Sequence, residues 1–450
     1  MASKYEMDMC SGPLFSKIVK YAVPMMLTSI LQLLYNAVDI IVVGRYVGST
    51  ALAAVGSTSS LINLIVNAFV GLSVGASVIL AQQIGAGKRT EAFKTVHTAM
   101  TTAIIVGIFL GFFGFFACRP LLELMGSPKD VIDQSTLYMK IYFLGMPAFI
   151  VYTFGSAVMR TVGDTKRPLV FLSISGLANV ALNLVFVLVF HMGVEGVAIA
   201  TIASQYISAL FVVFALLKSD GICRLLLKEL KICWKTLFSM IKVGVPVAVQ
   251  SCVFSLSNVL IQSSVNSFGS TAIAGNAAAA NIEGFLYVAM NAFGQSATTF
   301  AGQNYGAKQY KRITKTLLYC VSISFLIGAV AGPLMYIFGE PLLKIYSPEN
   351  IDAISFGLTR LRYIAFFYGV CGLMDSLSGT IRGTGSTFMP MLISILGVCG
   401  IRIVWVLTVF PMIHTLECLY VSYLLSWSFT AVLHAICYFV VVKRKFKSEN

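Results

Sequence analysis

Long apolar runs, separated by short polar loops, take up nearly the whole chain of 450 residues. A helix needs about 20 apolar residues to cross a bilayer, and on that basis the pattern predicts twelve helices. They lie near residues 16–44, 52–82, 92–117, 132–156, 168–190, 194–217, 236–266, 274–302, 313–337, 355–379, 389–411 and 416–441. Several exceed the thickness of a bilayer, which predicts tilt or extension beyond the lipid. The predicted fold class is an all-α polytopic membrane protein.

The order of motifs in the first half of the chain returns about 220 residues later. Residues 20–24, Lys-Tyr-Ala-Val-Pro, open the first apolar helix, and residues 242–246, Lys-Val-Gly-Val-Pro, open the seventh. A repeat of this length indicates two homologous lobes rather than a solenoid, and many transporters are built in this way. We expect an N-terminal lobe at residues 1–217, a cytoplasmic connector at 218–235 and a C-terminal lobe at 236–450.

Composition agrees with a membrane location, because 58% of the residues are hydrophobic and only 11% are charged. The ten cysteines are scattered, mostly inside apolar runs, and form no Cys-x-x-Cys motif. We interpret them as buried small side chains rather than as disulfides or zinc ligands. Residues 1–16 contain Glu6 and Asp8 and no apolar core, so no cleavable signal peptide is expected.

Basic residues are concentrated in alternate loops, and 24 of the 32 fall on one side of the predicted membrane. That side includes Lys4 and the tail at 443–447, whereas Lys129, Arg360 and Arg362 are assigned to the other side. Cytoplasmic loops carry an excess of lysine and arginine, so both termini are predicted to be cytoplasmic, in the cell membrane. The net charge of +14 is not gathered on a soluble face, and nucleic acid is therefore not an expected partner.

The chain has no phosphate-binding loop of the Gly-x-x-x-x-Gly-Lys-Ser/Thr type, since Gly87-Lys88 is followed by Arg89. Energy for any transport must then come from an ion gradient or from the gradient of the substrate itself. We expect no enzymatic activity and no cofactor. The four histidines are far apart and show no ligand spacing, so no metal site is predicted from them.

An acid in the first helix is the clearest candidate for function. Gln32, Asn36 and Asp39 have i, i+4 and i+7 spacing, which places them on one helix face. Polar groups deep in a membrane helix are costly and are candidates for function by default. The alternative is a structural carboxylate satisfied by its neighbours. The equivalent positions of the second half hold Phe254, Asn258 and Ile261.

Amides and a hydroxyl in the fifth and sixth predicted helices complete a possible cation site. Asn179 and Asn183 are four residues apart and present two amides from one face, and Thr201 lies in a run of small residues. With Asp39 these side chains supply only oxygen ligands, which Na⁺ and other hard cations prefer. A carboxylate that binds a proton also needs hydrogen-bond partners. Each residue alone could instead be a hydrogen-bonding contact between helices.

The second half carries a different polar set. Arg402 lies near the middle of the eleventh predicted helix and needs a counter-charge, and Glu283 and Asp375 are the acids available. They either form an internal ion pair or attract a cationic substrate. The candidate substrate-binding residues are Gln32, Tyr35, Asn258, Gln262, Glu283, Asp375 and Arg402.

With these motifs in order, the chain resembles the multidrug and toxic compound extrusion (MATE) family over nearly its whole length. The resemblance rests on residues 34–39, Leu-Tyr-Asn-Ala-Val-Asp, on the turn at 160–168 with its repeat at 382–390, and on residues 193–201. It implies two six-helix lobes around a central cavity, which opens alternately to each side as a drug leaves and Na⁺ or H⁺ enters.

The resemblance also implies roles for single residues. Asp39 matches the first-helix acid of the family, and Asn179, Asn183 and Thr201 match the cation site of its DinF-type branch. Some members have Asp where this chain has Asn183, which makes the site here less anionic. The NorM-type branch uses an acid in the seventh helix, and the seventh helix of this chain has none.

The resulting hypothesis is a secondary antiporter, a monomer in the lipid bilayer, that exports small cationic or amphiphilic organic compounds. The coupling ion stays open. Burial disfavours the charged form of Asp39 and favours proton exchange, while Asp39, Asn179, Asn183 and Thr201 can together surround Na⁺. A lipid-linked saccharide flippase is the alternative function, although such proteins are expected to have more arginines in the cavity. A channel or structural protein fits two lobes with one asymmetric acid less well.

Overall fold

The computed structural model describes residues 6–125, 131–346, 350–442 and 446. Lys4, Lys129 and the basic residues at 443–445 and 447, which entered the prediction of orientation, lie outside the described residues.

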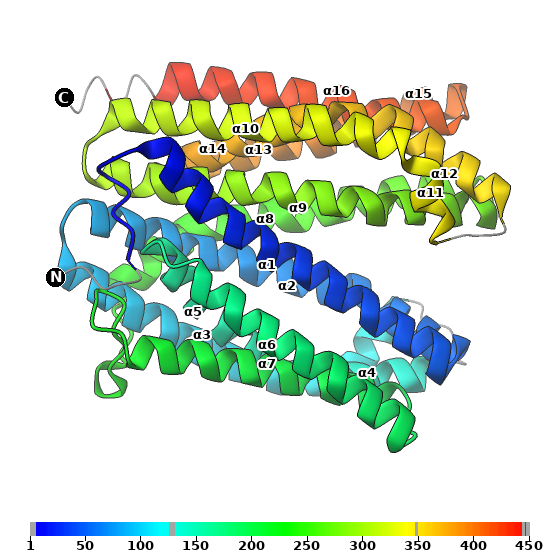
Figure 1. Ribbon diagram of the computed structural model, residues 1–450, viewed down its shortest axis with the longest axis horizontal. Helices are drawn as coiled ribbons and strands as arrows, with labels where there is room; N and C mark the ends of the chain where they lie inside the picture. The colour runs from blue at the N-terminus through cyan, green and yellow to red at the C-terminus, as the bar shows by residue number, and fades with distance from the viewer. Residues whose placement is uncertain (1–5, 126–130, 347–349, 443–445, 447–450) are drawn as a thin grey trace. The chain divides into compact units, whose positions relative to one another are not determined.

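All regular elements in these described ranges are helices (Figure 1), which confirms the predicted all-α class. In the first half they are α1 (Leu14–Val42) with the π-helical η1 (Val43–Val47), α2 (Ser49–Gly85), α3 (Arg89–Leu124), α4 (Ile132–Leu144), α5 (Met146–Thr161), α6 (Lys166–Leu184) with η2 (Val185–Val189), and α7 (Val194–Leu217). A short η3 (Leu227–Glu229) follows.

The second half has the same order of long helices. They are α8 (Trp234–Asn266), α9 (Ser270–Gly306), α10 (Tyr310–Ile337), α11 (Gly339–Lys344), α12 (Ile351–Ile364) with η4 (Ala365–Phe367), α13 (Tyr368–Gly383), α14 (Phe388–Ser394), η5 (Ile395–Gly400), α15 (Ile401–Met412), and α16 (Leu416–Cys437) with η6 (Tyr438–Val442).

Every predicted span contains a helix or a bent helix pair. Among the described residues, ten helices are long and apolar enough to cross a membrane, and α4 with α5, bent by 47° to each other, are so when taken together. The remaining prediction, 274–302, falls in α9, whose 37 residues are long enough but include many amides and small side chains. It is extensively buried, as expected of a less apolar helix that is shielded from lipid by its neighbours.

Helix α3 shows how small and large apolar residues are divided between packing and lipid. Its side chains Phe109, Phe112, Phe113 and Phe116 are all more than half exposed. The opposite face carries buried glycines that approach α4 and α5 closely. Helices in a membrane gain little from burying apolar surface against each other, so close contact through small residues favours their association.

The described residues fall into two compact units. Unit 1 comprises the described residues of Met1–Asp8, Leu27–Leu80 and Lys88–Gly244, and unit 2 comprises those of Met9–Met26, Ala81–Gly87 and Val245–Asn450. In unit 1, α5 packs against α3 and α7, and in unit 2, α9, α10 and α13 pack against one another, with α16 against α13 (Figure 1).

Three helices change unit along their length. In α2 the change falls between Leu80 and Ala81, and in the other two it lies close to a proline of the repeat. The change falls between Met26 and Leu27 in α1, which contains Pro24, and between Gly244 and Val245 in α8, which contains Pro246. Proline removes a helical hydrogen bond and favours a bend at that point. The predicted lobes at 1–217 and 236–450 stay a prediction about the repeat, since the contact-based units divide within helices.

Helices α9 and α13 approach each other through Gly379. A Cβ atom at this position would lie 2.3 Å from the backbone oxygen of Gly294. Because both atoms belong to helical backbones, neither can move away without a shift of the whole helix. We therefore expect Gly379→Ala to lower the free energy of unfolding by about 1–3 kcal/mol, which would appear as a lower apparent melting temperature in detergent.

Gly56→Ala is the matched control for this prediction. Gly56 also lies inside a long helix, α2, but nothing lies within 4 Å of a Cβ atom there. Alanine favours a helix over glycine by about 1 kcal/mol, so this variant should be as stable as the original protein or slightly more stable. Equal melting temperatures for the two variants would contradict the close approach at Gly379.

Candidate functional site

The first-helix acid lies close to the end of α1, one turn before η1. Gln32 and Asn36 are exposed on the same face and Asp39 is half-buried. The carboxylate is therefore within a helix of mostly apolar residues yet remains accessible.

Helices α6 and α7 bring the other predicted side chains to this carboxylate within unit 1. The Nδ2 atom of Asn183 donates to Asp39 Oδ1 at 2.5 Å and lies 3.3 Å from Asn179 Oδ1. The side chain of Thr201 also lies beside the carboxylate, while its hydroxyl donates to the backbone oxygen of Val197 at 2.9 Å. Four side chains from three helices thus form one cluster of oxygen atoms around a single charge.

The side-chain oxygen of Asn183 accepts no hydrogen bond in this cluster. The residue is fully buried, and its Oδ1 atom has no hydrogen-bond partner among the described residues. A buried acceptor without a partner costs about 1–3 kcal/mol. A cation beside Asp39, or a proton on the carboxylate, would satisfy this oxygen, because the first accepts oxygen ligands and the second donates a hydrogen bond.

Two further residues define the limits of the cluster. Asn36, which the sequence places on the same helix face, is not among the hydrogen-bond partners of Asp39 in the described structure. Tyr138 of α4 was not predicted, although it is 8% exposed and lies close enough to interact electrostatically with Asp39. A tyrosine in an apolar span was the only signal for it in the sequence.

Glu283 of unit 2 forms an ion pair that the sequence did not predict. Its partner is Arg360 of α12, whose Nη2 atom lies 2.8 Å from Oε2 and whose Nε atom lies 3.2 Å from both carboxylate oxygens. Tyr368 donates a further hydrogen bond at 3.2 Å. Both charged side chains are buried, at 1% and 9% exposure. Helix α12 packs against α9 and directs the Arg360 side chain into the protein. Its assignment to the non-cytoplasmic side of the membrane stays a prediction.

The internal ion pair of Arg402 with Glu283 or Asp375, one of the two alternatives from the sequence, is contradicted by the structure. Glu283 is occupied by Arg360, and Asp375 interacts with Arg382 and accepts a hydrogen bond from Asn291. Arg402 forms no ion pair within the described part of the chain. It lies over the ring of Tyr423 instead, at 3.9 Å from the ring centre.

The other candidates for substrate binding are divided between the units. In unit 1, Gln32 is exposed and the Tyr35 hydroxyl donates to the backbone oxygen of Ser173 at 3.3 Å. In unit 2, Asn258 is exposed, and Gln262 accepts from Asn276 at 2.9 Å. Their role in substrate binding stays a prediction.

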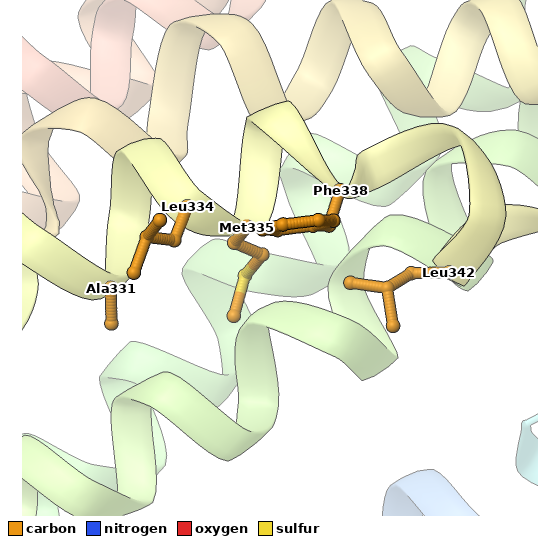
Figure 2. A pocket seen from close by; sticks show the side chains of 5 residues that line it. All are labelled: Ala331, Leu334, Met335, Phe338 and Leu342. Atoms are coloured by element: carbon orange, nitrogen blue, oxygen red, sulfur yellow. The ribbon is translucent and has the colours of Figure 1, made fainter.

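A separate depression in unit 2 contains none of these residues. It lies at the end of α10 and is lined by the apolar side chains of Ala331, Leu334, Met335, Phe338 and Leu342 (Figure 2). Without a polar group it offers no means of orienting a charged ligand.

Comparison with known proteins relates this arrangement to transporters. The MatE family model matches residues 24–185 and 246–408, one match in each repeat. A probable multidrug resistance protein of Bacillus subtilis, YpnP, is 28% identical over 397 residues, which are 88% of each chain. A probable multidrug resistance protein NorM of Thermotoga maritima is 25% identical over 86% of this chain and 84% of its own.

Solved structures agree on the fold. An outward-facing multidrug resistance MATE family transporter of the MOP superfamily has a TM-score of 0.91 and 21% identity, covering 100% of this chain and 99% of its own. At this identity the similarity establishes the two-lobed helical fold alone.

The buried ion pair at Glu283 generates a stability prediction. Arg360→Gln leaves the carboxylate buried without its counter-charge, and removing one partner of a buried pair costs about 3–5 kcal/mol. We expect a marked drop in apparent melting temperature. Replacing Glu283 by Gln in the same protein should recover most of the loss, because the remaining amides are both neutral.

Arg362→Gln is the control, because Arg362 is exposed on the same helix and the variant has the same net charge. Its apparent melting temperature should equal that of the original protein. An Arg360→Gln variant as stable as Arg362→Gln would show that Glu283 does not depend on Arg360.

Proposed function

The chain belongs to the MatE family of multidrug and toxic compound extrusion (MATE) transporters, and from this membership we propose that it is a secondary antiporter that exports amphipathic organic compounds in exchange for H⁺ or Na⁺. The observation that carries the ion-coupling part is the cluster at Asp39, where a carboxylate, two amides and a hydroxyl face one another. Asp39 is the acceptor of the coupling ion in this proposal.

The oxygen atoms of the cluster support exchange of a monovalent ion. Na⁺ would take Asp39, Asn179, Asn183 and Thr201 as ligands, and one carboxylate balances one positive charge. A proton would reside on Asp39 and hydrogen-bond to the unpartnered Oδ1 atom of Asn183. Both ions use the same carboxylate and would therefore compete for it.

The proposal also covers the branch of the family, the orientation in the membrane and the oligomeric state. The match of the cluster to the DinF-type branch, with no acid in α8, favours that branch over the NorM-type branch. The distribution of basic residues supports cytoplasmic termini in the cell membrane. We propose a monomer, because each predicted ion ligand comes from one chain and one unit.

Asp39→Asn tests the proposed coupling site. A permanently neutral amide cannot release a proton or balance Na⁺, so ion-driven export of a fluorescent dye from vesicles should fall at least about tenfold. The protein should remain folded, as judged by its melting temperature. Asp133→Asn, at an exposed acid of α4, is the matched control and should export normally. If Asp39→Asn retains most of the original export rate, Asp39 is not the acceptor of the coupling ion.

A second measurement identifies the ion. We expect a pH step in Na⁺-free buffer to drive export, because burial favours protonation of a carboxylate that has hydrogen-bond partners. Replacement of Na⁺ by choline at fixed pH should then leave export intact. Loss of export in choline, together with no response to the pH step, would show that Na⁺ is the coupling ion.

A further inference from the structure

Unit 2 contains a buried positive charge that no carboxylate in the described chain neutralises. Arg402 of α15 is 2% exposed. Its Nε atom donates to Ser426 Oγ at 3.2 Å, and its Nη1 atom lies 3.4 Å from Asn258 Oδ1. A guanidinium has five N–H donors, so these two hydrogen bonds leave most of its capacity unused.

The surroundings of Arg402 add a second cation rather than an anion. Arg360 lies over the same Tyr423 ring, at 5.6 Å from its centre, and Arg402 lies at 3.9 Å. Glu283 is the carboxylate in this group, and Arg360 occupies both of its oxygens. Two guanidinium groups therefore share one ring and one negative charge, which leaves the region with a net positive charge.

Stacking on aromatic rings accounts for only part of this arrangement. Tyr423 and Trp427 provide cation–π contacts to Arg402, and such contacts stabilise a desolvated cation. They supply no counter-charge. An ionisable side chain retained in a membrane span without a partner marks a substrate or ion site more often than a packing contact.

Of the two hydrogen-bond partners of Arg402, Asn258 is exposed and Ser426 is buried. Asn258 is exposed on α8, and its contact with Nη1, at 3.4 Å, is long for a hydrogen bond. An oxygen of an incoming anionic group can replace the Asn258 oxygen by displacement of one side chain. Guanidinium groups bind carboxylates and phosphates through two parallel hydrogen bonds.

The repeat gives this position a counterpart of opposite charge in unit 1. Asn258 corresponds to Asn36, one turn before Asp39, and Arg402 is one position from the counterpart of Asn179. The same two helices of each repeat thus carry a carboxylate with amides in unit 1 and a guanidinium with an amide in unit 2. The first set suits a cation, and the second suits an anion.

We propose that Arg402 binds an anionic group, a carboxylate or a phosphate, of the exported compound. Tyr423 and Trp427 beside it suit a ligand whose anionic group is attached to an apolar or aromatic body. This inference rests on the proposed export function and narrows its substrates to anionic or zwitterionic amphiphiles, whereas the sequence predicted cationic or amphiphilic compounds.

Binding of two probes of opposite charge tests the proposal. The full-length protein in phosphatidylcholine nanodiscs is titrated by calorimetry with 2-naphthoate, 2-naphthyl phosphate or 2-naphthylmethylammonium at constant ionic strength. We expect at least one anionic probe to bind more tightly than the ammonium probe. Arg402→Gln should weaken anion binding at least about tenfold, while Arg362→Gln, at an exposed site on α12, should not. Tighter binding of the ammonium probe, or an Arg402→Gln variant that binds anions normally, would overturn the proposal.

Asn258→Asp keeps the proposal testable if Arg402→Gln fails to fold. This variant places a carboxylate beside the intact guanidinium, so it should raise the melting temperature and abolish anion binding by occupying the site from within. Unchanged stability together with unchanged naphthoate binding would contradict an anion site.

Two further measurements distinguish a failed anion site from failed export, and a substrate site from a lipid-headgroup site. Asp39→Asn should bind 2-naphthoate normally even where it fails to export, so a failed export mechanism is distinguishable from a failed anion site. In nanodiscs that contain phosphatidylglycerol, naphthoate binding should be unchanged. Competition by this lipid that disappears in Arg402→Lys would assign the site to a lipid headgroup and overturn the assignment to substrate.

Discussion

The hydrocarbon core of a bilayer provides no hydrogen-bond partners and no counter-ions, so every polar group of a membrane-spanning helix must find them within the protein. The Glu283–Arg360 pair meets this requirement fully, through three guanidinium contacts and a tyrosine hydroxyl. Other polar groups meet it only in part. The Oδ1 atom of Asn183 and the guanidinium of Arg402 are buried and incompletely satisfied in the described structure.

A buried polar group without enough hydrogen bonds is a candidate for function, because such a group costs free energy in a membrane interior. Several buried polar atoms of the described chain lack a partner, and the two groups at Asn183 and Arg402 differ in chemistry. Asn183 adds a free oxygen to a carboxylate cluster, whereas Arg402 adds a charge to a region that already contains Arg360. In the proposed exchange of a cation for an organic compound, unit 1 holds the proposed ion site and unit 2 the proposed anion site. Divergence of the two halves after duplication is a simple way to obtain them.

Small residues make such polar contacts possible by letting helices approach closely. Gly379 brings α13 against the backbone of α9, the helix that carries Glu283 and Asn276. The prolines at 24 and 246 have another effect, since α1 and α8 leave one compact unit for the other close to them. The chain thus uses local backbone features to place a small number of costly side chains.

Hydropathy and helical periodicity were enough to predict an all-α membrane protein and a shared face for Asn179 and Asn183, because these properties depend on residues near one another in the chain. They also placed Asp39 on a helix with polar neighbours. The order of motifs was enough to predict the repeat. The pairing of Arg360 with Glu283 could not be predicted from the sequence, because the two residues lie 77 positions apart, on α12 and α9. The sequence also could not show that Arg402 lacks a counter-charge. The same half of the chain contains two acids, Glu283 and Asp375, but in the structure each interacts with another arginine. Charge pairing depends on which helices pack together and at what depth, and only the tertiary structure contains that information.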